Sequence, residues 1–183
     1  LSPIKGLPRL QQLILTTNLI ASVAPLAGNR ALQYIDLNHN KVKDIAPLTG
    51  LTNLSVLYLS DNQVKTISPI TALPKLHSFY IDRNGITSIS GLNKLRWLSS
   101  LSASGNQIAD LKPLNGLENL TFLFLERNKI ANLDPLFKML KADFDSKQRF
   151  SPFVRIYLKG NPLDAKAKKG VPEFQKKYHT RFK

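Results

Sequence analysis

Apolar positions recur along the chain at a fixed period, in register with a repeated asparagine. Two apolar residues stand three and five places before each asparagine, as Leu59 and Leu57 stand before Asn62. The asparagine returns every 22 residues, and its last return comes after 33. These residues are Asn18, Asn40, Asn62, Asn84, Asn106, Asn128 and Asn161. A register kept at this many columns indicates an internal repeat.

Each repeat predicts one short strand. Apolar residues two places apart lie on the same face of a strand, so that face is expected to turn inward. One unit cannot bury this face alone, whereas stacked units bury a continuous core. We therefore expect seven parallel strands in one curved sheet. Their predicted centres are residues 13, 35, 57, 79, 101, 123 and 156.

A proline at one fixed place in each unit constrains the segment that returns to the next strand. The place is held by Pro25, Pro47, Pro69, Pro113 and Pro135, with Gly91 in the one gap. Proline cannot join a strand ladder or continue a long helix, so short return segments are expected. The repeated asparagine is expected to face the interior, where its amide must be hydrogen-bonded. A ladder of asparagines bonded to the backbone of adjacent coils meets this requirement.

The segment Leu54 to Asn62 (LSVLYLSDN) resembles the leucine-rich repeat family. Residues 42–51 and 130–136 carry an Ile-x-x-Ile-x-Pro-Leu type of pattern. This pattern resembles a subclass that includes bacterial internalins and regulatory subunits of protein phosphatase. The resemblance covers residues 1–165. It implies an α/β solenoid, a horseshoe with a parallel β-sheet on the concave face and short 3-10, irregular or helical segments on the convex face. The recurring proline favours the internalin-like branch.

The pattern predicts one leucine-rich-repeat domain over residues 1–183. Residues 1–10 match the end of a preceding repeat, with Pro3 at the place of the recurring proline, so a cap or further repeats are expected upstream. Six 22-residue repeats are expected over 10–141, and an insertion with a seventh repeat over 142–164. Residues 165–183 are expected to form a basic C-terminal cap.

Two segments outside the regular repeat have patterns of their own. Pro135 near the start of residues 134–150, together with the apolar spacing there, predicts a longer helix on the convex side. The C-terminal cap combines basic residues with apolar ones that are expected to cover the last coil. The apolar residues are Val171, Phe174, Tyr178 and Phe182.

In each predicted strand, the residues that alternate with the inward ones point to the concave side. Six of these residues are aromatic, although folding requires no apolar surface there, and tyrosine and phenylalanine supply rigid contact area to a partner. Two aromatic patches are expected, separated by small residues such as Ser100 and Ser102. The competing interpretation is that the aromatics only stabilise the sheet. The predicted partner-binding residues are Tyr34, Asp36, Tyr58, Tyr80, Asp82, Phe122, Phe124, Arg155 and Tyr157.

The net charge of +14 is unevenly distributed. Residues 138–183 hold 13 lysines and arginines against 4 acidic residues. This basic end is expected either to be solvated or to attract an anionic partner. No groove-reading motif is present, so nucleic acid is not an expected partner.

The sequence carries no pattern of catalysis or metal binding. The absence of cysteine excludes a disulfide framework, a thiolate zinc site and a cysteine nucleophile. The three histidines lack metal-ligand spacing, and no phosphate-binding or dinucleotide-binding loop occurs. His39 and Asp61 fall on the same edge of adjacent units, where a surface hydrogen bond is expected. We therefore expect no catalytic site, no metal and no cofactor, and no apolar run is long enough to cross a bilayer.

The leading hypothesis is a scaffold that binds a protein partner through its concave face. The internalin resemblance implies a bacterial surface, secreted or host-delivered protein rather than a cytoplasmic one. The alternative is an intracellular regulatory subunit of an enzyme such as a protein phosphatase. A third hypothesis is an architectural repeat region within a longer protein.

Overall fold

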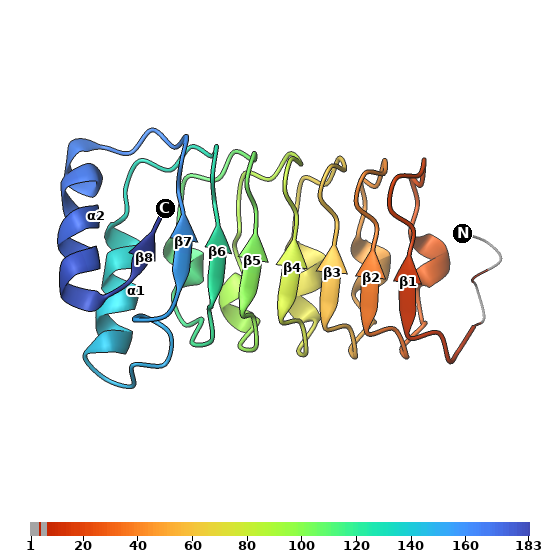
Figure 1. Ribbon diagram of the computed structural model, residues 1–183. Helices are drawn as coiled ribbons and strands as arrows, with labels where there is room; N and C mark the ends of the chain where they lie inside the picture. Colours follow the sequence, from red (N-terminus) through yellow and green to blue (C-terminus); the bar gives the residue numbers. More distant parts are fainter. Residues whose placement is uncertain (1–3, 5–6) are drawn as a thin grey trace.

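The computed structural model describes residue 4 and residues 7–183. Within this part, eight parallel strands lie side by side in sequence order in one open sheet (Figure 1). Each strand pairs with the strand one unit further on, as Leu57 pairs with Phe79. The seven predicted strands are confirmed at their predicted centres, whereas the eighth was not predicted. The strands are β1 (Gln12–Ile14), β2 (Tyr34–Asp36), β3 (Val56–Tyr58), β4 (Ser78–Tyr80), β5 (Ser100–Ser102), β6 (Phe122–Phe124), β7 (Arg155–Tyr157) and β8 (Arg181–Phe182).

The return segments contain short 3-10 helices, which lie behind the sheet (Figure 1). Four of them have the recurring proline in their first turn, where its missing N–H costs nothing. In the fifth, Gly91 precedes the helix with a φ of 89°. A Cβ there would lie 2.9 Å from Thr71 Cγ2, so this position requires glycine. The 3-10 helices are η2 (Ala24–Leu26), η3 (Ala46–Leu48), η4 (Ser68–Ala72), η5 (Leu92–Lys94) and η6 (Lys112–Leu114).

Two α-helices close the C-terminal end. Helix α1 (Asp134–Phe144) replaces the 3-10 helix of its unit, as the sequence predicts, and α2 (Ala165–Tyr178) packs against it. The rings of Phe137 and Phe174 stack between the helices with centroids 4.5 Å apart. Helix α2 begins at Asp164, whose side chain accepts a hydrogen bond from Ala167 N (2.7 Å). The chain then returns as β8 beside β7 (Figure 1).

The core is a continuous stack of aliphatic side chains between the sheet and the return segments, with Phe79 the largest fully buried residue. The asparagine ladder lies beside this stack. In Asn62, the amide nitrogen donates to Leu37 O of the preceding unit (2.9 Å) and the amide oxygen accepts from Val42 N (2.9 Å). The same pair of bonds recurs at Asn40, Asn84, Asn106, Asn128 and Asn161. Six of the seven asparagines therefore satisfy the backbone between coils, as predicted. The prediction is wrong for Asn18, which is exposed and whose side-chain hydrogen bonds to described residues stay within its own unit.

The two ends of the repeat array are packed in different ways. At the insertion, the buried carboxylate of Asp143 accepts hydrogen bonds from the backbone N–H groups of residues 149, 150 and 151, which fixes the loop after α1. At the other end, Ile4 and Leu10 pack against the core, whereas Leu7 is exposed. The expectation for Pro3, and for the rest of 1–3 and 5–6, lies outside the described residues.

Candidate protein-binding face

The strand register separates inward from outward side chains. In strands such as β2 and β3 the central residue is buried and its two neighbours are partly exposed. The outward residues of the eight strands form the surface that we call the concave face. It carries eight of the predicted site residues on strands, and Asp82 lies just after β4. These positions follow from the pairing of each strand with its neighbour at a constant offset.

Three tyrosines form one aromatic cluster on β2, β3 and β4. The rings of Tyr34 and Tyr58 meet edge to face with centroids 5.6 Å apart. The rings of Tyr58 and Tyr80 stack with centroids 4.6 Å apart. Desolvation raises the pKa of Tyr34, and the nearby Asp36 carboxylate raises it further. Desolvation likewise raises the pKa of Tyr58. The hydroxyl groups of Tyr34 and Tyr58 therefore remain protonated, and able to donate hydrogen bonds, at neutral pH.

A second cluster lies on β6 and β7 and differs in its charge. The ring of Phe124 stacks on Phe122 and on Tyr157, with centroids 6.1 and 4.5 Å away. The guanidinium of Arg155 lies 5.5 Å from the centroid of Phe122. Lys183 Nζ, which follows β8, lies 5.9 Å from the centroid of Tyr157. This phenylalanine cluster is therefore flanked by cations.

Buried serines separate the two clusters. Ser100 and Ser102 on β5 are 8% and 6% exposed. Ser102 Oγ donates to Asp82 Oδ1 (2.6 Å), and Ser104 N donates to the same oxygen (2.7 Å). Ser100 Oγ shares a hydrogen bond with the hydroxyl of Tyr80 (3.1 Å). The carboxylate of Asp82 is thus hydrogen-bonded to residues of the neighbouring repeat. The strip between the clusters, formed by Ser100 and Ser102, carries only small polar side chains.

The edge beyond the strands carries a fixed ion pair. Arg83 donates two hydrogen bonds to Asp61, with nitrogen–oxygen distances of 2.6 and 2.5 Å. The expected contact of His39 with Asp61 is present, with Nδ1 3.3 Å from Oδ2. The hydrogen bond from Arg83 lowers the pKa of Asp61, and the charges of Arg83 and His39 add to this effect. The side chains of Arg83 and His39 are more than half exposed, so these ion pairs order the edge more than they stabilise the fold.

The repeat and the fold can be compared with known proteins. A family model described as "Leucine Rich repeats (2 copies)" matches residues 30–72, 52–94 and 96–138. The chain belongs to the leucine-rich repeat family. A search of curated protein sequences finds no match.

Solved leucine-rich-repeat structures show the same arrangement. An internalin C2 of Listeria monocytogenes is 31% identical, with a TM-score of 0.78 over 88% of this chain and 66% of that chain. An internalin of the same species is 25% identical, with a TM-score of 0.70 over 99% of this chain and 56% of that one. A leucine-rich-repeat protein of Leptospira interrogans shares the fold at 23% identity, with a TM-score of 0.80 over 100% and 50% of the two chains. The repeats are therefore internalin-like, and the chain spans one half to two thirds of the length of these structures.

Leucine-rich-repeat proteins of this kind are typically non-enzymatic scaffolds for protein interaction. Across the described residues, no cluster of histidine and acidic side chains is arranged to hold a metal ion. Nor does any helix in that part of the chain have the length and apolar character needed to cross a membrane.

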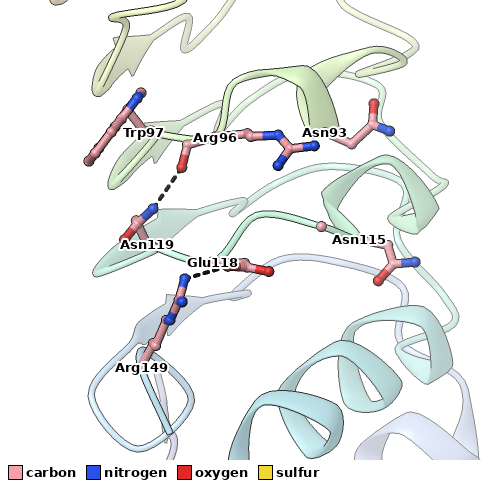
Figure 2. A pocket seen from close by; sticks show the side chains of 8 residues that line it. Asn93, Arg96, Trp97, Asn115, Glu118, Asn119 and Arg149 are labelled. Carbon is pink, nitrogen blue, oxygen red and sulfur yellow. Dashed lines mark hydrogen bonds and ion pairs between the residues drawn. The ribbon is translucent and has the colours of Figure 1, made fainter. Parts of the chain in front are cut away.

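One surface feature of the leucine-rich-repeat chain was missed by the sequence analysis. Trp97, on the loop before β5, is 66% exposed and borders a hollow with a cavity volume of about 520 Å³. Figure 2 shows this hollow on the edge of the repeats, between the strand side and the 3-10 helices. The signal was available, because Lys75 and Asn119 occupy the same place in adjacent repeats and mark it as a solvent position.

Proposed function

We propose that the chain is a recognition module that binds a protein partner through its concave face, as a bacterial surface, secreted or host-delivered protein. The two aromatic clusters carry this proposal. Six aromatic side chains lie on a face that the core does not use, and large rigid side chains of this kind dominate binding energy at protein interfaces. The internalin structures with the same fold support the bacterial assignment.

The charges around the two clusters favour a partner whose surface carries basic groups at one end and acidic groups at the other. Asp36 lies beside the tyrosine cluster, whereas Arg155 and Lys183 lie over rings of the phenylalanine cluster. Opposite charges across an interface steer association and fix orientation. The partner in this proposal therefore presents basic groups to the tyrosines and acidic groups to the phenylalanines. The proposed contacts include all nine predicted residues, with Asp82 contributing mainly by holding the serine strip in place.

A double substitution tests the proposal. Proteins captured from host-cell extract by the parent chain are compared with those captured by the Tyr58→Ala/Tyr80→Ala variant. A partner bound by the parent should bind this variant more weakly by about 2 kcal/mol, which corresponds to roughly a thirtyfold rise in Kd. Circular dichroism melts of both proteins establish whether the variant keeps the fold. If the rings only stabilise the sheet, the variant should melt at a lower temperature and bind the partner as tightly as the parent does.

The matched control is Lys168→Ala/Lys169→Ala on helix α2, outside the strands that form the concave face. This variant should change mainly the salt dependence and the association rate, measured at low and physiological salt. If the lysine variant loses affinity while the tyrosine variant binds like the parent, the concave face is not the binding surface. The basic C-terminal end would then be the site, and an anionic partner its ligand.

A further inference from the structure

Trp97 is the only tryptophan of the chain, and its exposure has no structural reason. It lies outside the core, and the equivalent places in the two adjacent repeats hold polar residues, Lys75 and Asn119. The indole borders two hollows, one with Arg96 and Glu118 and the other, of about 680 Å³, with Lys75 and His77. A large exposed ring beside a hollow offers a ligand rigid apolar contact area with a polar N–H group at its edge.

The first hollow is lined by planar polar side chains. Figure 2 shows Trp97, Asn119 and Arg149 along the strand side, and Asn93 and Asn115 along the side of the 3-10 helices. Arg96 and Glu118 lie between the two rows (Figure 2). Amide, guanidinium and carboxylate groups each offer two hydrogen-bonding atoms in one plane. The wall therefore suits a ligand with adjacent pairs of oxygen atoms.

Parts of this wall are fixed by internal contacts. Asn119 Nδ2 donates to the carbonyl oxygen of Arg96 (2.7 Å), which ties the loop of Trp97 to the next repeat. The backbone of Arg149 is held by the buried Asp143, and its guanidinium pairs with Glu118. In contrast, the side chains of Asn93, Arg96 and Asn115 make no hydrogen bond to any described residue, so their polar atoms are available to a ligand.

The charge of the hollow is positive. Glu118 is matched by Arg149 and also has Lys147 Nζ 3.8 Å from its carboxylate. Arg96 makes no ion pair within the described part of the chain and keeps an uncompensated guanidinium. A guanidinium binds a carboxylate through two parallel hydrogen bonds. The ligand that fits therefore carries a carboxylate as well as neutral oxygen atoms.

We infer that the hollow beside Trp97 is a saccharide-binding site that takes a uronic-acid residue. The C–H face of a pyranose ring stacks on the indole, as apolar groups do on aromatic rings. Asn93 and Asn115 lie across the hollow from Trp97 (Figure 2), so their amides bond to vicinal hydroxyl groups of a neighbouring residue of the same saccharide, whose carboxylate bonds to Arg96. A peptide anchor would instead require an apolar pocket, whereas Trp97 is the one aromatic residue among the mostly polar side chains that line this hollow. The site lies on a different surface from the concave face and is independent of the partner proposed there.

The sole tryptophan makes a direct titration possible. Trigalacturonate is added to the full chain at roughly 0.15 M salt, where long-range charge effects are screened, and the fluorescence of Trp97 is followed. The fully methyl-esterified trisaccharide is the matched neutral probe, and a triglutamate peptide is the acidic probe without sugar rings. We expect a saturable change in emission with trigalacturonate, about tenfold weaker binding of the ester, and no saturation with triglutamate.

Variants measured by calorimetry assign the binding to residues. Trp97→Ala should weaken trigalacturonate binding about tenfold or more, and Arg96→Ala should abolish the preference for the acid over the ester. Lys168→Ala/Lys169→Ala on α2 should bind trigalacturonate like the parent. The proposal is overturned if no saccharide saturates the signal, if triglutamate binds as well as trigalacturonate, or if Trp97→Ala binds unchanged. Binding lost only in the lysine variant would instead place an anion site on α2.

Discussion

The asparagine ladder makes a quantitative prediction for Asn84→Ala. In the native protein the amide oxygen of Asn84 accepts a hydrogen bond from the backbone N–H of Val64 (2.8 Å), a residue that is fully buried. The amide nitrogen donates to three carbonyl groups, those of Leu59, Ile81 and Asp82. Alanine removes all four contacts. Their costs differ, because the backbone groups differ in what other partners they have.

The three carbonyl groups keep a partner after the substitution. Leu59 O still accepts from Asn62 Nδ2 (3.1 Å), and Ile81 O from Asn106 Nδ2 (2.9 Å). The carbonyl of residue 82 still accepts from the backbone N–H of residue 61 (2.9 Å). Only the N–H of Val64 is left buried without a partner. One such group costs about 1–3 kcal/mol, which is the expected loss in the free energy of unfolding.

Urea melts followed by circular dichroism measure this loss, with Asn18→Ala as the matched control. Asn18 occupies the same column, but it is exposed, and its amide oxygen accepts no hydrogen bond from a described residue. Its removal should shift the free energy of unfolding by less than about 0.5 kcal/mol. Because repeats couple to their neighbours, hydrogen exchange should show the opening near residue 64 first. Equal midpoints for Asn84→Ala and the parent would refute this account of the ladder.

Two further predictions concern local geometry. Gly91→Ala should lower the free energy of unfolding by roughly 1–2 kcal/mol in urea melts, because of its left-handed φ and the close approach of Thr71, whereas Gly50→Ala, with open space around its Cβ, should be nearly neutral. Arg83→Ala should raise the pKa of Asp61 in an NMR titration of its carboxyl carbon, because it removes the bond that lowers this pKa. A lowered carboxyl pKa stabilises the fold above the unfolded pKa, and this contribution is lost as the pH falls through the folded pKa. The acid limb of the stability curve should therefore flatten slightly in Arg83→Ala, and an unchanged pKa of Asp61 would show that the ion pair does not form in solution.

The regular part of the fold was predictable because its pattern repeats. One pair of alternating residues, such as Leu57 and Leu59, is compatible with many sheet arrangements. The same spacing around seven asparagines determines both the strand positions and the parallel register. The two aromatic patches followed from that register, since alternate residues of a strand point to opposite faces. Their separation into a tyrosine cluster and a phenylalanine cluster is therefore a consequence of the sequence pattern, and the ring distances in the structure agree with it.

The structure adds features that have no repeating signal. Strand β8 is only two residues long and forms because α2 returns the chain to the edge of β7, so no alternation marks it. Its position explains why Lys183 reaches Tyr157, which the sequence could not show. The sequence analysis names Asp82 as a partner-binding residue, and it could not show that the carboxylate also accepts hydrogen bonds from serines one repeat away on either side. Such contacts depend on rotamers, which a repeat pattern does not specify.

Because the register of the sheet is constant, the number of strands between the two aromatic clusters sets the distance between them. Tyr80 on β4 and Phe124 on β6 are separated by one strand, β5, so the spacing between the clusters is a whole number of repeats. Duplicating the 22-residue unit that contains β5 would move the clusters apart by one strand, about 4.8 Å, without altering either of them. Under the proposed function, insertion or loss of a single repeat would change the size of the partner that spans both clusters, while every proposed contact residue stays the same.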